Sequence, residues 1–238
     1  MANLWSEIQS HLLFISFCIL VFAVIIALSI LAEHFVMKQR RGLKGARTIA
    51  SIAMFSALSA VLMLLEIPLF FAPGFYKLDL SEVPVLICTF YLGPVSGVVC
   101  EFLKVVLKIL LKGTSTAFVG EFANFVVGCS FVLPAAIVYQ ILHSKRGASA
   151  ALGVGTLCLI LFGSFFNAWY LLPKFAELYG IPLDAIIAMG TSVNASITNV
   201  RTLVLFAVVP FNLVKGVIDS VLTFLLYKRV SRLLFRNR

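Results

Sequence analysis

The stretch from Val83 to Lys112, VPVLICTFYLGPVSGVVCEFLKVVLKILLK, decides how many helices this chain forms. It is apolar along most of its length, but Gly93-Pro94 interrupts it near the middle. Glycine permits turns, and proline cannot donate a backbone hydrogen bond inside a helix. The stretch therefore predicts two helices, at about 83–92 and 94–112, of which the first is unusually short.

The composition indicates a membrane protein. Of the 238 residues, 61% are hydrophobic and 12% are charged, whereas a soluble domain is about half apolar and about a quarter charged. A soluble domain of this size could not bury so much apolar surface. We expect an all-α membrane protein in which 1–45 forms an extra N-terminal transmembrane helix with a basic cytoplasmic linker, and 46–238 forms a six-helix membrane domain.

The first apolar run, Leu12 to Ala32, is long enough to cross a bilayer, which takes about 20 helical residues. A cleaved signal peptide is the competing interpretation, but it would need a basic start and a shorter apolar run. Residues 1–9 contain no Lys or Arg, and basic residues follow the run as in a stop-transfer signal. We therefore expect a retained helix.

The remaining helices and the orientation follow from the breaks and the charges. Further helices are expected at about 47–67, 118–142, 149–172 (ended by Pro173) and 201–229, joined by outer loops at 68–82 and 173–199. Lys and Arg concentrate in cytoplasmic loops. Counting helices places three basic clusters on one side of the membrane: 37–47, 143–147 and the C-terminal tail. The sequence thus predicts a multi-pass plasma-membrane protein with its N-terminus outside and its C-terminus cytoplasmic.

The net charge of +9 is explained by the same clusters. They lie beside apolar runs, where they act as topology signals and attract anionic lipid. No soluble basic face is visible, so we expect the lipid bilayer as a partner and no nucleic acid.

Charged side chains at membrane depth are informative, because each costs about 2.5–3.5 kcal/mol on insertion scales. Glu101, Lys104, Lys108 and Lys112 form one stripe on their helix. The stripe is either a charge-lined path or a Glu101–Lys104 pair, with Lys108 and Lys112 extending to the outer surface.

Other polar residues mark a candidate site near the outer surface. Glu121 and Asn124 are three residues apart on one helix face, close to the polar loop 114–116. Asn167 lies near the outer end of its helix and offers amide donors and an acceptor, although an interhelical hydrogen bond is the simpler interpretation. Capping of the helix N-terminus is an alternative explanation for part of the Glu121 and Asn124 pattern.

The segment after Pro210 is the strongest element of this site. Asn212 and Lys215 share a helix face, and a proline frees backbone groups within a helix. The alternative is a structural pair between Lys215 and Asp219, which are four residues apart.

We find no catalytic or metal-binding pattern in the sequence. The three histidines lie in separate segments, and there is neither a nucleophile elbow nor a phosphate-binding loop. We therefore expect no enzyme, no cofactor and no metal site, and an energised transporter would need an ATPase from another chain.

From about Ala46 to Leu234 the chain resembles the substrate-binding S components of energy-coupling factor (ECF) vitamin transporters, and most closely their riboflavin-specific branch. Six segments carry the resemblance: Lys77-Leu-Asp-Leu-Ser-Glu-Val-Pro84, Leu92-Gly-Pro94, Gly113-Thr-Ser-Thr-Ala117, Gly120-Glu-Phe-Ala-Asn124, Asn167 in its helix, and Pro210-Phe-Asn-Leu-Val-Lys-Gly216. The first helix lies outside it.

The resemblance implies a six-helix fold that captures riboflavin on the extracellular side. It also implies partners, namely a transmembrane coupling protein and two ATPase subunits. Asn167, Asn212 and Lys215 would bind the polar edge of the flavin ring. Glu121 and the loop around Thr116 and Gly120, with Ala117 and Asn124 beside them, would bind the ribityl chain. The residues near Tyr76–Asp79, including Leu78, would close over the ligand.

The resemblance further implies a docking helix with regularly spaced alanines. Ala46, Ala50, Ala53 and Ala57 form such a small-residue stripe, and small residues let helices approach closely. Packing of the extra N-terminal helix on this stripe is the alternative.

Two other functions remain open. One is an S component for a different vitamin or base precursor. The other is a stand-alone secondary transporter, although those often contain inverted repeats and we find no convincing repeat.

Overall fold

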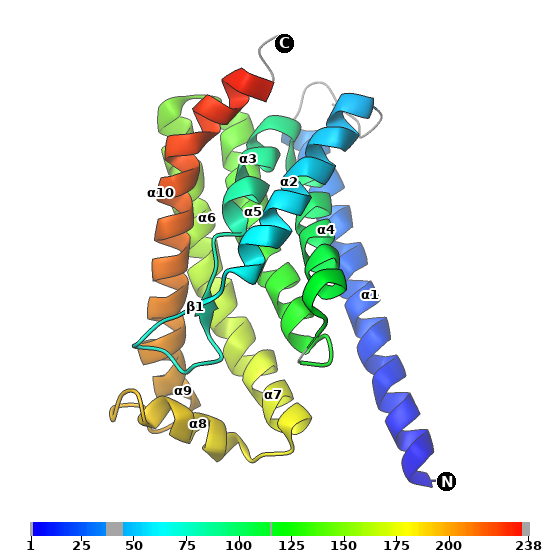
Figure 1. Cartoon of the computed structure of the whole chain (residues 1–238), viewed down its shortest axis with the longest axis vertical. Helices are drawn as coiled ribbons and strands as arrows, with labels where there is room; N and C mark the ends of the chain where they lie inside the picture. Colours follow the sequence, from blue (N-terminus) through cyan, green and yellow to red (C-terminus); the bar gives the residue numbers. More distant parts are fainter. Residues whose placement is uncertain (1, 37–44, 115, 235–238) are drawn as a thin grey trace.

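The computed structural model describes residues 2–36, 45–114 and 116–234, with side chains for 14–36, 45–114 and 116–230. The described chain is almost wholly helical (Figure 1). Its elements, in order, are α1 (Ala2–Val36), α2 (Ala46–Leu64), β1 (Ile67–Pro68), β2 (Lys77–Leu78), α3 (Glu82–Leu92), α4 (Pro94–Lys112), α5 (Val119–Leu142), α6 (Lys145–Phe166), the π-helical η1 (Asn167–Leu171), α7 (Leu172–Tyr179), α8 (Leu183–Thr191), α9 (Val200–Leu203), the π-helical η2 (Val204–Val208) and α10 (Val209–Leu234).

The expectation of an all-helical membrane protein is confirmed. Within the described residues, five helical stretches are long and apolar enough to cross a membrane: Phe14–Val36, Ala46–Leu64, Val119–Leu142, Lys145–Tyr179 and Val200–Val230. α4 is of similar length but carries the charged stripe, and α3 is shorter. Most of the basic cluster at 37–47 and the end of the basic tail lie outside the described residues.

The break at Gly93-Pro94 lies where the sequence predicts it. Gly93 ends α3 with a φ of 101°, a backbone region that favours glycine, and Pro94 begins α4. With 11 residues, α3 is only about 17 Å long, roughly half the thickness of a bilayer core. Figure 1 shows the antiparallel β1–β2 hairpin below α3, so the loop between α2 and α3 enters the lower half of the bundle.

The prediction that Pro173 ends a helix is wrong. The helix continues from α6 through η1 into α7 as far as Tyr179. Leu172 N–H bonds to the carbonyl of Asn167, five residues back, so the backbone widens just before the proline. This π geometry lets the helix pass the missing proline N–H. The predicted loop 173–199 therefore contains most of α7 and all of α8.

The last helix shows the same arrangement at Pro210. Val209 N–H bonds to the carbonyl of Val204, and the π segment η2 ends two residues before the proline. α8 and α9 lie at the lower end of the bundle in Figure 1, below α10.

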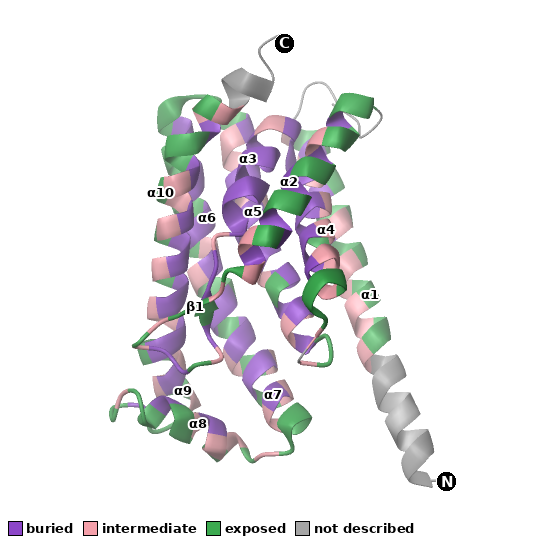
Figure 2. Ribbon diagram, in the orientation of Figure 1, coloured by how far each residue is buried: buried purple, intermediate pink, exposed green. Residues whose placement is uncertain are grey.

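The helices pack around two large groups of buried apolar side chains. α5 packs on α6, α10 packs on α6 and α3, and α2 packs on α3 and α4. Figure 2 shows buried residues on the inner sides of these helices and exposed residues along the outer side of α2. α1 packs on α4 and α5, where the Glu33 carboxylate accepts a hydrogen bond from Val95 N–H (3.3 Å) at the start of α4.

The close approach of α5 and α6 generates a prediction about Gly155. A Cβ at this position would lie 2.7 Å from the Phe131 ring and 2.8 Å from the Phe131 carbonyl oxygen. We expect Gly155→Ala to lower the free energy of unfolding by about 1–3 kcal/mol, because the overpacked helices must separate. Thermal unfolding of the purified protein measures this change.

Gly153→Ala, two residues away, is the matched control. A Cβ at Gly153 meets nothing within 4 Å, so its midpoint should stay the same or rise slightly through better helix propensity. Equal midpoints for the two variants would contradict the packing argument.

Candidate functional site

The two π segments contact each other inside the bundle, and the two candidate amides lie beside them. Asn167 begins η1, Asn212 follows η2, and both are buried. Asn167 Nδ2 donates to the Gly163 carbonyl (2.7 Å), and a Cβ on Gly163 would lie 2.9 Å from Asn212 Nδ2. The absence of a side chain at Gly163 therefore lets the two amides converge.

The loop between α2 and α3 reaches these amides through Tyr76. The Tyr76 hydroxyl donates to Asn167 Oδ1 (2.8 Å), and its ring lies 5.3 Å from the Phe211 ring. Tyr76 is buried. The loop therefore occupies one acceptor of the site.

Lys215 finds its partner in the same loop. Its Nζ lies 2.8 Å from Asp79 Oδ2, and both side chains are buried. The alternative of a Lys215–Asp219 pair is therefore wrong. The Lys215 ammonium neutralises the buried Asp79 carboxylate, which would be costly to leave unpaired. Asp79 Oδ1 also accepts from Ser81 N–H (2.9 Å) and from the Ser81 hydroxyl.

Asn212 carries an unsatisfied donor. Among the described residues, its Nδ2 has no hydrogen-bond partner although it is fully buried. Leaving a buried donor unpaired costs about 1–3 kcal/mol. The Ser164 and Tyr170 hydroxyls, from α6 and η1, are buried and unpartnered in the same sense. The π-segment region thus holds polar groups that a ligand could satisfy.

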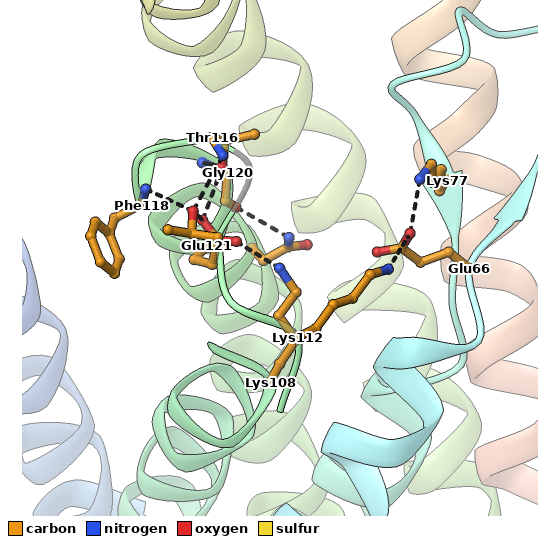
Figure 3. A network of polar contacts seen from close by, with 10 residues as sticks. Glu66, Lys77, Lys108, Lys112, Thr116, Phe118, Gly120 and Glu121 are labelled. Atoms are coloured by element: carbon orange, nitrogen blue, oxygen red, sulfur yellow. Dashed lines mark hydrogen bonds and ion pairs between the residues drawn. The ribbon is translucent and has the colours of Figure 1, made fainter. Parts of the chain in front are cut away.

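A second polar group surrounds Glu121, as Figure 3 shows. Its carboxylate accepts from Lys108 Nζ (2.6 Å), Thr114 Oγ1 (2.8 Å) and Thr116 Oγ1 (2.9 Å). Thr116 Oγ1 in turn accepts from Gly120 N–H (3.0 Å). Lys108 is buried in this ion pair, which excludes the interpretation in which it extends to the outer surface.

The other predicted residues near this group differ in exposure. Asn124 is exposed and donates to the Gly120 carbonyl of its own helix (3.1 Å), so it does not share the buried environment of Glu121. Ala117 is exposed and has a φ of 43°. Leu78 is buried in the hairpin, where it pairs with Ile67.

Glu66, which the sequence analysis did not single out, ties the hairpin to α4 (Figure 3). Its Oε2 lies 2.9 Å from Lys77 Nζ and 3.0 Å from Lys112 Nζ. Partial burial opposes ionisation of Glu66, but the hydrogen bonds from the two lysines outweigh it and lower its pKa. Its position two residues after the end of α2 and two residues before Pro68 is the sequence signal that marks it.

The middle of the charged stripe is held by two acids. Lys104 Nζ lies 2.5 Å from Glu101 Oε1, which confirms the predicted pair, and 2.8 Å from Glu82 Oε1. All three side chains are buried. Glu82 was missed as a partner because it lies on another helix, α3. This cluster joins α3 to α4.

The alanine stripe lies on the free side of α2. Ala46, Ala50, Ala53 and Ala57 are exposed, whereas Ala60 is buried. Within the described residues, α1 packs on α4 and α5, and these four alanines are exposed. In the part of the chain that the structure describes, no group of three or more His, Cys, Asp or Glu residues could hold a metal ion.

The sequence and the fold match known proteins. A family model for the substrate-specific component of ECF transporters matches residues 47–227. The riboflavin transporter RibU of Staphylococcus aureus (strain TCH60) is 30% identical over 80% of this chain and 93% of its own length. The riboflavin transporter FmnP of Bacillus subtilis (strain 168) is 31% identical over 76% of this chain and 90% of its own.

A solved structure of the S component of a bacterial ECF transporter superposes with a TM-score of 0.62. It is 32% identical in sequence, and the match covers 79% of this chain and 98% of the solved one. The chain therefore belongs to the ECF transporter family as a substrate-specific S component, a non-enzymatic subunit of a membrane transport system.

Proposed function

We propose that this S component captures riboflavin on the extracellular side and delivers it inward with a transmembrane coupling protein and two ATPase subunits. The observation that carries this proposal is the pair of facing π segments with Asn167 and the unsatisfied Asn212 amide. The similarity of this chain to proteins named riboflavin transporters supports the choice of ligand.

The chemistry of the site suits the polar edge of a flavin. That edge alternates carbonyl acceptors with an N–H donor, and the amides of Asn167 and Asn212 offer both kinds of group. Lys215 adds a charged donor. Glu121, Thr116 and Gly120 supply polar groups for the ribityl hydroxyls. Asn124 and Ala117 lie beside these residues.

The loop contacts support the proposal that this loop encloses the ligand. Tyr76 bonds Asn167, and Asp79 bonds Lys215. Riboflavin would share or replace these bonds, and the loop with Tyr76, Leu78 and Asp79 would close over it.

The membrane arrangement that fits this function has six spanning units and one additional N-terminal helix, α1. The units are α2, α3 with its hairpin, α4, α5, α6 with α7, and α9 with α10. α1 precedes the family match, which starts at residue 47. The exposed residues Arg47, Lys145 and Arg146 lie in the first turns of α2 and α6, and exposed Arg229 lies near the end of α10. These helix ends lie at the top of Figure 1, and basic residues on one side favour a cytoplasmic C-terminus and an outer N-terminus.

Riboflavin should bind the isolated protein one to one and lose its fluorescence on binding. Asn212→Leu should weaken this binding by roughly 10- to 100-fold, because the flavin loses a buried hydrogen bond. The folded protein should keep its stability, because the amide donor lacks a partner without ligand. Fluorescence titration and thermal unfolding measure the two effects.

Gln140→Leu is the control, because Gln140 is also a buried amide and donates to the Phe90 carbonyl far from the site.

Lys215→Met tests the ion pair and should lower both stability and affinity, because it leaves Asp79 buried and unpaired. Adding Asp79→Asn should restore stability but not affinity. Unquenched flavin at micromolar concentration, or unchanged affinity in Asn212→Leu, would refute the proposed site.

Glu66 should slow riboflavin release by holding the hairpin closed. Its pKa is lowered, so its contribution is present above the ordinary carboxyl pKa and is lost as pH falls through the lowered value. Glu66→Gln should speed release at neutral pH by about two- to fivefold and remove the acid dependence, since exposed pairs are weak.

Stopped-flow dissociation of bound flavin measures this rate. Glu177→Gln removes another exposed pair, with Lys174, and should leave release unchanged. Identical release rates in Glu66→Gln and the wild type would show that the hairpin is held by other contacts.

The exposed alanines of α2 should dock on the coupling protein. Ala53→Trp should abolish co-purification with the coupling protein and keep riboflavin affinity, because the bulky ring prevents close helix approach. Leu161→Trp changes an exposed position on α6 and should assemble normally. Full assembly of both Ala53→Trp and Ala57→Trp would exclude this face.

A further inference from the structure

A groove lies on the outer surface between α6 and α10, away from the candidate site. It encloses about 380 Å³, and its lining is mostly apolar, with Leu152, Gly153, Val221 and Phe224 among its residues. The Thr156 and Ser220 hydroxyls in the groove bond to each other (2.9 Å). The groove therefore suits an apolar chain that brings no polar groups of its own.

Gly153 provides the room for this groove. A Cβ at Gly153 would meet nothing within 4 Å, so the helix surface is open there. Ser220 Oγ also reaches the Leu152 carbonyl (3.5 Å). These contacts place Leu152 and Ser220 at the same height along the antiparallel helices.

Basic side chains lie at the same end of both helices. Lys145 and Arg146 begin α6 and are exposed, while Lys228 and Arg229 lie near the end of α10. They are six to nine residues beyond the Leu152–Ser220 level, which is roughly 9–14 Å along a helix. The groove therefore runs toward a group of four cations from two neighbouring helices.

The charge of this end is unbalanced. Residues 143–156 and 220–230 contain no Asp or Glu, and none of the four cations joins the ion pairs formed within the described residues. The start of α6, where the Ser144 side chain caps Gly147 N–H, adds partial positive charge.

We propose that this groove binds an anionic phospholipid. One acyl chain lies over Gly153 between α6 and α10, and the phosphate head group contacts Lys145, Arg146 and Arg229. Charge complementarity carries the choice of occupant: a zwitterionic lipid could fill the groove but gains far less from four cations. The alanine stripe proposed for the coupling protein lies on another helix, α2, which Figure 1 shows toward the other side of the bundle from α10.

Native mass spectrometry of the full chain, with equal dioleoyl-phosphatidylglycerol and dioleoyl-phosphatidylcholine, tests the proposal. We expect one phosphatidylglycerol to be retained about tenfold or more over phosphatidylcholine. Lys145→Gln with Arg146→Gln should weaken its retention by roughly 20- to 30-fold, because each cation near the surface contributes about a fivefold factor.

Gly153→Phe tests the acyl chain separately. Its open surroundings allow the ring without a clash, so the variant should fold, as thermal unfolding will check, and should lose retention of both lipids. Arg47→Gln with Arg201→Gln removes two exposed cations elsewhere on the chain and should leave retention unchanged.

Four outcomes would overturn the proposal. The first is equal retention of the two lipids, and the second is unchanged retention in the Lys145/Arg146 double variant. The third is competition by inorganic phosphate as effective as competition by the lipid, which would indicate a phosphate site that binds no acyl chain. The fourth is a dimer that Gly153→Phe dissociates, which would make the groove an interface between two copies. None of these readouts depends on riboflavin.

Discussion

The buried ion pair between Lys215 and Asp79 is the contact on which the site depends. A lysine in the middle of a transmembrane helix is costly unless a partner neutralises it. The partner comes from a loop 136 residues earlier in the chain, so that loop must enter the bundle. The short α3 makes this possible, because it crosses only about half of the bilayer core and leaves the rest of that space to the hairpin and loop. The same loop brings Tyr76 to Asn167.

The two prolines have a related consequence. In lipid, every backbone polar group needs a partner from the protein itself. Before Pro173 and before Pro210 the helix widens into a π segment instead of ending. The widened turns face each other and carry or adjoin the two site amides. The feature that accommodates the prolines therefore also shapes the candidate site.

Local features of the fold could be predicted from the sequence, and long-range partners could not. Gly93-Pro94 acts through its own backbone, so its break was predictable at the residue level. Pro173 was wrongly predicted to end its helix, because the π segment that accommodates it cannot be inferred from the proline alone.

The side-chain partners show the same limit. Glu101 and Lys104 are three residues apart, and their pair was predicted. For Lys215 the nearest acid in sequence, Asp219, was a reasonable candidate, but the true partner lies in a distant loop. The interpretation that placed Lys108 at the surface missed its partner for the same reason, because Glu121 lies on the next helix.

A continuous series of bonds links the exposed helix α2 to the candidate site. Ser59 on α2 donates to the Ser81 carbonyl, Ser81 donates to Asp79, and Asp79 pairs with Lys215 on α10. Each of these groups is buried, where a broken hydrogen bond is expensive. A displacement of α2 relative to α10 must therefore either carry the loop along or break one of these bonds. Since the loop also holds Tyr76 against Asn167, the geometry of the site and the position of α2 are physically constrained by the same contacts.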